Sequence, residues 1–347
     1  MSQLTVFALP SVGTETTLSA DLAPVPGWCR LGRKNDVRHI VSRPAAGGKE
    51  TVFTISPVAG EDLVLTADRA AADTFVAGSA WNWARALSSL GATSIGVSGP
   101  VASVSDKRMF IDEARRRSFT PHLFCGGAMA TTLNVRDPAG RGSTLFCVRE
   151  PYRVPVTVRA ELLSARAKIL LLGSLRPHDL ELAQMIVGAG NADEVVIVAN
   201  EELLSAAYWP MLGNLLTRAT VFQMNHVEAE RLVGGPLNRD RIRGLNRLGP
   251  KIVIVTLDKD GTVLVERGQE PIFQPSFPVR QVDDCGAGDA HLAAFVYYHL
   301  LHPVLLPLSV CLKMAVWIAG RTVEHVGPVN GIPGQEEREA QLRHFLS

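Results

Sequence analysis

The chain has 347 residues, of which 46% are hydrophobic and 20% are charged. This length suits one large α/β domain or two modest ones, and the composition excludes bulk disorder and a small disulfide-stapled module. Lys and Arg number 35 against 34 Asp and Glu. Such near-neutrality argues against nucleic acid or an anionic membrane surface as the main partner.

The cysteines and the apolar stretches bear on the compartment. The five cysteines are odd in number, widely spaced and without a C-x-x-C pair: Cys29, Cys125, Cys147, Cys285 and Cys311. They suit neither a zinc ribbon nor a disulfide framework and favour a reducing compartment. The most apolar stretch, 291–320, is interrupted by histidines, prolines and a lysine before it reaches the roughly 20 residues of a membrane span. Two buried helices joined at the prolines explain it. The N-terminal residues lack a basic region followed by an apolar core, so we expect no signal peptide. We expect a cytoplasmic protein without a membrane partner.

Short apolar runs rich in β-formers alternate with helical segments along the chain. The predicted strands are Thr5–Leu9, Ser94–Val97, Lys168–Leu172, Val195–Ala199, Thr220–Gln223, Lys251–Leu257 and Thr262–Glu266. Several are apolar nearly throughout, as strands buried on both faces of a parallel sheet are. Ser79 is predicted to cap a helix that runs through Leu90 and stops at Gly91, and Ser105 to cap one through Arg117. The alternation predicts a doubly wound, mostly parallel α/β sheet flanked by helices.

Two segments, at about 14–76 and 120–155, break this rhythm with turn-rich, strand-like sequence. In the first, Val37–Val41 and Thr51–Ile55 flank the turn residues 44–48; in the second, Thr131–Arg136 and Ser143–Val148 flank 137–140. Both patterns are typical of hairpins. They predict a small accessory β-sheet, a lid, on a single domain of residues 1–347. The role of the extra segment at about 30–75 stays open.

The segment 282–290, Val-Asp-Asp-Cys-Gly-Ala-Gly-Asp-Ala, carries the strongest chemical signal, because an apolar helical run follows it. Small residues before a helix let backbone N–H groups surround an anion, and the helix dipole favours negative charge there. Asp289 is then placed in the first turn, beside that anion. In phosphoryl transfer such amides stabilise the moving phosphoryl while the carboxylate accepts the proton of the attacking hydroxyl. A tight turn with a first-turn Asp is the structural alternative.

The residues 283–289 resemble the D-T-x-G-A-G-D signature of the PfkB/ribokinase family of sugar and nucleoside kinases. Other segments match this family's motifs in its order along the chain: 5–27, ending Pro-Val-Pro-Gly; 77–92, against G-G-x-x-x-N…A…L-G-A; 225–232, against N-x-x-E; 256–261, against T-x-G-x-x-G; and 327–333, against the closing G-A/P-x-x-x-x-P turn. The resemblance covers nearly the whole chain. It implies a ribokinase-like fold and an ATP-dependent, magnesium-requiring kinase.

The resemblance also implies a role for each matching residue. Asp289 is expected to be the catalytic base, and Gly286, Ala287 and Gly288 to form the anion hole. The expected nucleotide-binding residues are Asn225, Glu228, Thr256, Asp258 and Gly261, with Glu228 holding Mg²⁺ through water. The position of a monovalent cation, such as K⁺, in relatives corresponds to Asp283, Cys285, Thr322 and Gly327. The acceptor is expected beside Gly13, Glu15, Gly78, Ser79, Asn82 and Asp289.

Several residues depart from the ribose-binding pattern of the family. Gly13 and Glu15 stand where ribose-type kinases have Asn and Asp, and Ser79 stands where Lys often follows the glycines. Leu175 replaces an acidic residue, and Asp258 replaces the first glycine of the nucleotide loop. The phosphate chemistry is therefore retained while the sugar-reading residues are changed, and ribose itself is not expected to be the acceptor.

The leading hypothesis is a kinase that phosphorylates a hydroxyl of a small sugar or sugar-like polyol. A nucleoside kinase is the alternative within the family, and Trp81 or Trp83 would then be free to stack on a base. A catalytically silent ligand-binding relative, with Asp258 blocking the adenine loop, is the alternative outside it. The acceptor, the hydroxyl and the oligomeric state stay open; one expectation is a homodimer formed through the lid.

Overall fold

The computed structural model describes residues 4–10, 13–19, 34–44, 50–57, 62–68, 73–125, 130–136, 143–148, 152–173 and 175–347. A nine-stranded sheet forms the centre of the molecule, in the order β16-β15-β14-β13-β12-β11-β1-β7-β8. Its strands are β1 (Leu4–Pro10), β7 (Ile95–Val101), β8 (Thr120–Cys125), β11 (Ala167–Gly173), β12 (Ala192–Val198), β13 (Val221–Asn225), β14 (Ile252–Thr256), β15 (Thr262–Glu266) and β16 (Ile272–Gln274). The pairs from β8 to β14 are parallel, whereas β14–β15 and β15–β16 are antiparallel. This confirms the predicted mostly parallel sheet.

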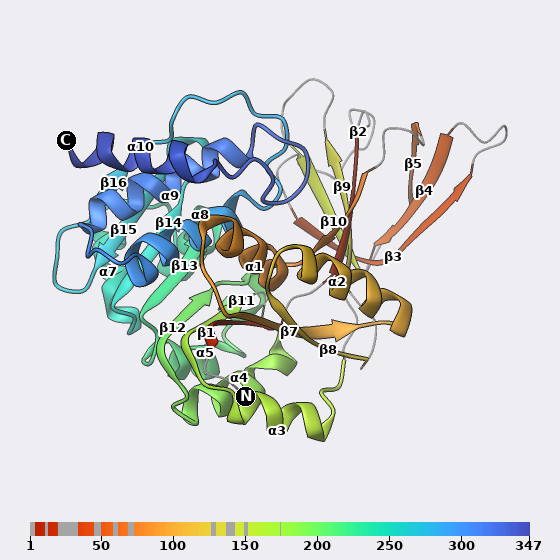
Figure 1. The fold of residues 1–347 in the computed structure, drawn as a ribbon, viewed down its shortest axis with the longest axis horizontal. Coiled ribbons are helices and arrows are strands. Elements are labelled where there is room, and N and C mark those ends of the chain that lie inside the picture. The colour runs from red at the N-terminus through yellow and green to blue at the C-terminus, as the bar shows by residue number, and fades with distance from the viewer. Residues whose placement is uncertain are drawn as a thin grey trace.

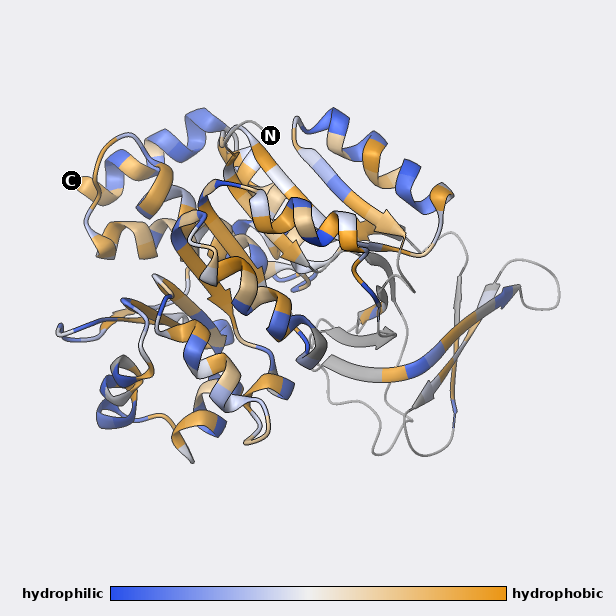
Figure 2. Ribbon diagram, turned by 90° about the horizontal axis from the view of Figure 1, so that it is seen from below, coloured by the Kyte–Doolittle hydropathy of each residue, from blue (hydrophilic) through white to orange (hydrophobic). Residues whose placement is uncertain are grey.

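Helices cover both faces of this sheet, as Figure 1 shows. They are α1 (Ser79–Leu90), α2 (Val104–Arg116), α3 (Val156–Ser164), α4 (Pro177–Gly188), α5 (Trp209–Leu216), α6 (His226–Val233), α7 (Arg239–Gly244), α8 (Ala287–Val296), α9 (Leu308–Thr322) and α10 (Gln335–Leu346). One apolar core lies under α1, α8 and α9, and a second lies under α4 and α5. The strands between the two cores are largely coloured as hydrophobic in Figure 2, and their successive side chains alternate between one core and the other. Burial on both faces explains why their sequences do not alternate between apolar and polar residues.

A second, seven-stranded sheet projects from one side of the helical body (Figures 1 and 2). Its order is β5-β4-β3-β10-β9-β2-β6, from strands β2 (Gly13–Ser19), β3 (Lys34–Pro44), β4 (Glu50–Pro57), β5 (Leu63–Asp68), β6 (Asp73–Ala77), β9 (Ala130–Arg136) and β10 (Ser143–Val148). We call it the lid sheet. The segment at 30–75 supplies its outer strands β3, β4 and β5. Residues 120–125, which the sequence analysis placed in the second lid segment, pair with β7 and extend the large sheet instead.

The N-terminal caps of two helices differ from the prediction. Helix α1 begins at Ser79, and its N-cap is Gly78, whose φ of 101° disfavours any residue with a Cβ. Helix α2 is capped by Ser103 rather than Ser105, because Ser103 has the extended backbone of an N-cap and its Oγ accepts the Asp106 N–H at 3.1 Å. Ser105 lies inside the first turn. A serine near a helix start therefore marked the right region but the wrong residue.

The apolar stretch at 291–320 forms two helices, as predicted. Helix α8 ends in a π-helical turn at Tyr297–Leu301, a loop with Pro303 and Pro307 follows, and α9 begins at Leu308. Within the part of the chain that the structure describes, no helix combines the length and the apolar character that a membrane crossing needs.

Candidate active site

The Asp289 carboxylate lies in the first turn of α8 and is held by a residue from a distant part of the chain. Asn82, in the second turn of α1, donates from Nδ2 to Asp289 Oδ2 at 2.7 Å. Asn82 is 4% exposed, whereas Asp289 is partly exposed. Two motifs separated by 207 positions therefore meet at one carboxylate. The bond fixes the orientation of Asp289 and leaves it accessible from outside.

Gly286 and Gly288 shape the chain at the N-terminus of α8. Gly286 is the N-cap with a φ of 74°, and a Cβ there would come within 3.0 Å of the Pro328 Cα and the Val329 N. At Gly288 a Cβ would meet no atom of the described residues within 4 Å, so among these residues the space in front of this turn is open. Because the first N–H groups of a helix have no partner within it, an anion in this space would meet backbone donors and the positive end of the helix dipole.

The three predicted anion-hole amides are not equivalent. The Ala287 N–H is directed at the Asp284 carbonyl at 3.2 Å and closes the turn. The backbone of Gly288 is fixed from behind, because Gln223 of β13 donates from Nε2 to the Gly288 carbonyl at 3.1 Å. The geometry therefore favours Gly286 and Gly288 over Ala287 as donors to a phosphoryl group.

Asn225 and Glu228 cap helix α6 for each other. The Glu228 N–H donates to Asn225 Oδ1, and the Asn225 N–H donates to Glu228 Oε2, both at 2.8 Å. This capping box stabilises the helix start, so both residues have a structural role beside the predicted one. It engages one oxygen of each side chain. The Asn225 residue is exposed and Glu228 is partly exposed, where the carboxyl end of β13 meets solvent.

The nucleotide-loop residues follow β14, the strand next to β13. Thr256 is the register partner of Asn225, so the two predicted nucleotide motifs lie side by side at one edge of the sheet. Gly261 has a φ of 114°, and a Cβ there would come 2.1 Å from the Gln274 carbonyl oxygen. Asp258 has a φ of 50° and a carboxylate 72% exposed, 3.5 Å from Nδ1 of His226. Asp258 is therefore at the surface of this loop.

The Asp283 carboxylate is buried and already surrounded by N–H donors. Oδ1 accepts from Asn134 Nδ2 and from the Cys285 amide, both at 3.1 Å, and Oδ2 accepts from the Gly327 amide at 2.9 Å. The Thr322 carbonyl accepts from the His325 amide at 3.1 Å. A monovalent cation at this carboxylate would have to compete with these donors, so the residues fit such an ion poorly and we derive no step through it. Asn134 comes from lid strand β9, so this carboxylate joins the lid sheet to the anion-hole turn.

The expected acceptor residues lie where the lid sheet meets the body. By backbone register, Glu15 of β2 is opposite Phe75 of β6, and Gly13 is opposite Ala77. Gly78 and Ser79 follow directly and begin α1. The sequence analysis missed Phe75, which is partly exposed and packs against Gly327, where a Cβ would lie 2.6 Å from the Phe75 Cζ. An aromatic residue just before the A-G-S turn is the signal that would have found it.

Three apolar residues predicted near the acceptor belong to the core. Trp81 and Trp83 are fully buried; Trp81 packs edge-on against Phe110 and Phe119, and Trp83 lies over Gly173. Neither ring is available to stack on a base, so that hypothesis is wrong. Leu175 is 1% exposed and packs in the core beside α4. These side chains fill the space between helix and sheet, which a local sequence window does not reveal.

His291 on α8 is a buried polar residue that the sequence analysis left unassigned. Its Nδ1 lies 3.1 Å from Gln223 Oε1, and its Nε2 lies 3.2 Å from Thr262 Oγ1. Burial lowers the pKa of His291 to about 4. The neutral ring thus links α8 to β13 and β15 behind the predicted base. Among the described residues no group of three or more His, Cys, Asp or Glu is placed to hold a metal.

We expect His291 to make stability fall at mildly acidic pH. As the pH drops below 6.5 the unfolded chain gains a proton at this residue, whereas the folded chain resists it down to about 4. The free energy of unfolding should therefore decrease by about 2 kcal/mol between pH 7.5 and 5 relative to a His291→Gln variant, and be unaffected above pH 7. Urea unfolding of both proteins at the two pH values measures this difference. Parallel profiles would show that the ring is protonated or hydrated in the folded state.

Known proteins resemble part of this chain in sequence. A family model described as pfkB family carbohydrate kinase matches residues 131–335, more than half of the chain. An ATP-dependent 6-phosphofructokinase of Thermoanaerobacterium thermosaccharolyticum is 31% identical over 122 residues, 35% of this chain and 37% of that protein. A deoxyribokinase of Salmonella typhi is 32% identical over 131 residues, 36% of this chain and 40% of that protein. The matched parts thus span well under half the length of these curated relatives.

The fold extends the likeness to the whole chain. The structure of an adenosine kinase from Sinorhizobium meliloti superposes with a TM-score of 0.72 at 18% identity, covering 98% of this chain and 100% of that one. At that identity the likeness concerns the fold alone. Together with the family match over 131–335, it confirms the ribokinase-like architecture inferred from the motifs. The chain belongs to the pfkB family of carbohydrate kinases.

Proposed function

We propose that this protein transfers the γ-phosphate of ATP to a hydroxyl of a small sugar or sugar-like polyol, with Asp289 as the general base. The observation that carries the proposal is the placement of the Asp289 carboxylate, held by Asn82 at 2.7 Å, beside the open N-terminal turn of α8. A base and an anion-stabilising helix end are the two elements that phosphoryl transfer requires of the protein. The names of the curated relatives, a phosphofructokinase and a deoxyribokinase, support a sugar acceptor.

In this mechanism the acceptor hydroxyl gives its proton to Asp289 as its oxygen attacks the γ-phosphorus, and ADP leaves with the electrons of the broken P–O bond. Asn82 holds the carboxylate in the orientation in which it accepts this proton. The amides of Gly286 and Gly288 stabilise the charge on the transferring phosphoryl group, and Gln223 fixes the Gly288 peptide that presents one of them. The proton and the phosphoryl group would then both be received at the start of α8.

The nucleotide is proposed to lie along the carboxyl ends of β13 and β14, beside Thr256, Asp258 and Gly261. A Mg²⁺ ion would be held by the phosphates and, through water, by Glu228 near Asn225. The fit is reasonable, because Mg²⁺ keeps most of its waters and needs only one or two carboxylates, and Glu228 is a partly exposed one. When bound, the ion would neutralise charge on the β- and γ-phosphates.

We expect Glu228→Gln to raise the magnesium concentration needed for half-maximal activity several-fold and to lower turnover. This substitution is selective, because Gln at the third helical position still completes the capping box with Asn225. The melting temperature should therefore stay near that of the parent. Magnesium titrations at saturating ATP measure the effect. Superimposable titration curves would leave Glu228 with its capping role alone.

A nucleoside kinase is the second candidate function, and Phe75 favours it. Its partly exposed ring at the junction of lid sheet and body offers an apolar face for a base. The fold likeness to an adenosine kinase is compatible with this reading. A catalytically silent relative would need Asp258 to close the adenine loop. Its carboxylate is instead 72% exposed and beside His226, which argues against that reading.

Single-turnover phosphate transfer from γ-labelled ATP to a panel of sugars, polyols and nucleosides tests the proposal. Labelled product with a sugar or polyol, formed about 100-fold or more slowly by Asp289→Asn, supports it. Labelled product with nucleosides only would establish the second function. No labelled product with any acceptor, despite ATP binding, would favour a binding role. A cytoplasmic location and a homodimer through the lid sheet remain predictions, which cell fractionation and sedimentation would check.

A further inference from the structure

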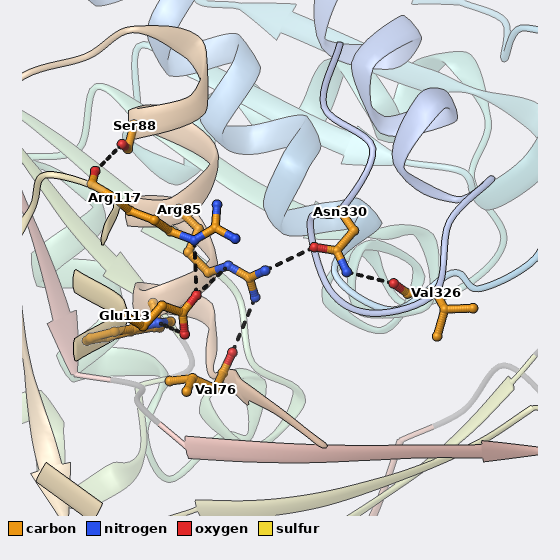
Figure 3. A network of polar contacts seen from close by, with 8 residues as sticks. Val76, Arg85, Ser88, Glu113, Arg117, Val326 and Asn330 are labelled. Carbon is orange, nitrogen blue, oxygen red and sulfur yellow. Dashed lines mark hydrogen bonds and ion pairs between the residues drawn. The ribbon is translucent and has the colours of Figure 1, made fainter. Parts of the chain in front are cut away.

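Arg85 is a buried cation on α1 that contacts three separate parts of the chain (Figure 3). It is 4% exposed. Its Nη2 donates to Asn330 Oδ1 at 3.0 Å, its Nη1 donates to the Val76 carbonyl at 3.3 Å, and its Nε lies 3.1 Å from Glu113 Oε1 of α2. A buried charge costs several kcal/mol unless it is paired. The burial of Arg85 is therefore not explained by packing alone.

Glu113 supplies the counter-charge for Arg85 and is itself shared. Its Oε1 also lies 3.1 Å from Nε of Arg117, and its Oε2 accepts from Trp81 Nε1 at 3.3 Å. Arg117 has 36% of its side chain exposed, whereas that of Arg85 has 5%. Both arginines contact the same carboxylate, but Arg85 also contacts the Val76 carbonyl and Asn330, on the side of the predicted active site. Its planar fork reaches two further acceptors at once, which a Lys ammonium on a flexible stem would not reproduce.

The Asn330 contact reaches the turn that forms the wall of the predicted anion hole. Asn330 accepts from Arg85 and donates from Nδ2 to the Val326 carbonyl at 2.7 Å, as Figure 3 shows. Between them, Val329 has a φ of 51°, a conformation that costs a β-branched residue about 1–3 kcal/mol and persists only when its surroundings hold it. The Pro328 Cα and the Val329 N lie against Gly286. Relaxation of this strained turn would therefore displace the first anion-hole residue.

The Val76 contact reaches the point where the lid sheet joins the body. Val76 belongs to β6, the last lid strand, and Gly78 follows it as the N-cap of α1. On the same strand, Phe75 packs against Gly327 at the other end of the strained turn. One guanidinium thus connects the lid strand to the turn that supports Gly286.

We propose that Arg85 is a positioning residue that holds the turn 326–330 and the end of β6 in register, so that the Gly286 and Gly288 amides are aligned for phosphoryl transfer. Arg85 acts through Asn330 and does not touch the reacting atoms. This proposal rests on the proposed kinase function and predicts that loss of the Arg85–Asn330 contact lowers turnover rather than the affinity for the acceptor or for ADP.

The test compares Arg85→Lys and Asn330→Ala with Arg117→Met as the matched control. Arg85→Lys and Asn330→Ala are expected to lower kcat by roughly 10- to 100-fold, the effect of misplacing reacting groups by about 1 Å. The acceptor KM and the ADP Kd should stay within about threefold of the parent. Arg117→Met removes an equal contact to Glu113 but none to the turn, so its kcat should stay within about twofold.

A double-mutant cycle shows whether the two residues act together. If Arg85 acts through Asn330, the double variant should be no slower than the slower single variant, because the second change removes a contact already lost. A second readout is the ratio of AMP-PNP to ADP affinity, which should fall in both variants because only AMP-PNP carries a γ-phosphoryl group. A general loss of structure would weaken both nucleotides equally.

Three results would overturn the inference: parent-like kcat in Arg85→Lys, multiplicative effects in the double variant, or an Arg117→Met loss equal to that of Arg85→Lys. If Arg85→Lys does not fold, Asn330→Ala decides together with Asn330→Asp: both lose the donor to the Val326 carbonyl, but the aspartate keeps an acceptor for Arg85 and should be the faster of the two. Failure of the kinase function itself is distinguishable, since the parent protein would then transfer no phosphate to any acceptor of the panel.

Discussion

An Asp289→Asn variant is expected to lose about 10²- to 10⁴-fold in kcat, the usual effect of removing a general base. The amide cannot take the acceptor proton at neutral pH. It is nearly the same size as the carboxylate, and its Oδ1 can still accept from Asn82 Nδ2, so the first turn of α8 should keep its position. ATP and acceptor affinities should therefore stay within a few-fold of the parent. Steady-state kinetics and nucleotide titration on the same preparation separate the two quantities.

Asn82, which donates the hydrogen bond to Asp289, offers a control for the Asp289→Asn variant. Asn82→Asp places a second carboxylate beside Asp289, at a position that is 4% exposed, so repulsion between the two charges favours a proton shared by the pair. We expect its turnover to recover as the pH is raised, which Asp289→Asn cannot do. If Asp289→Asn kept the turnover of the parent on the true acceptor, Asp289 would not be the general base. The N-terminal turn of α8 would then be the only part of the proposed mechanism that still stands.

The large sheet could be predicted from the sequence because its strands are buried on both faces. Val195–Ala199 was found as an apolar run, and the strand in the structure is Ala192–Val198. The core of the strand carries the hydropathy signal, but its ends are set by hydrogen bonds to β11 and β13, which polar residues such as Asp193 and Glu194 make equally well. The lid strands were instead predicted from strand-like sequence on either side of turns: Val37–Val41, Thr51–Ile55, Thr131–Arg136 and Ser143–Val148. Strand β5 and the order of the strands in the lid sheet were not predicted. Register across strands distant in sequence is not encoded in local alternation.

The phosphate side of the site was predictable from its motifs, whereas its supports were not. Gln223 lies in an otherwise apolar strand and His291 in an apolar helix, and both would pass for satisfied core residues. In the structure Gln223 donates to the Gly288 carbonyl, and His291 contacts Gln223. Arg85 and Glu113 look like ordinary surface charges of two amphipathic helices. A hydropathy pattern assigns charged residues to the surface, because an unpaired buried charge is costly. It does not reveal that two helices bring opposite charges together in the interior.

The two glycines at the start of α8 should respond differently to the same small change. Gly288 lies within the helix, and no atom in the described part of the chain lies within 4 Å of where its Cβ would be. Gly288→Ala should therefore fold as well as the parent or gain up to about 1 kcal/mol, because Ala has the higher helix propensity. The methyl group would nevertheless occupy the space proposed for the γ-phosphoryl group. We expect kcat to fall by about 10²-fold or more, as it does when an oxyanion-hole donor is lost.

Gly286→Ala should lose both stability and activity. At a φ of 74° an Ala is strained, and its Cβ would lie 3.0 Å from the Pro328 Cα and the Val329 N of the already strained closing turn. Thermal unfolding and kcat of both variants form the measurement, with the ADP Kd as the control for an intact nucleotide site. If Gly288→Ala kept the turnover of the parent, the γ-phosphoryl group would have to lie elsewhere than at this helix end. If Gly288→Ala is stable but inactive and Gly286→Ala is unstable, Gly288 supplies the amide that meets the phosphoryl group. Gly286 is then the residue that holds the turn in place.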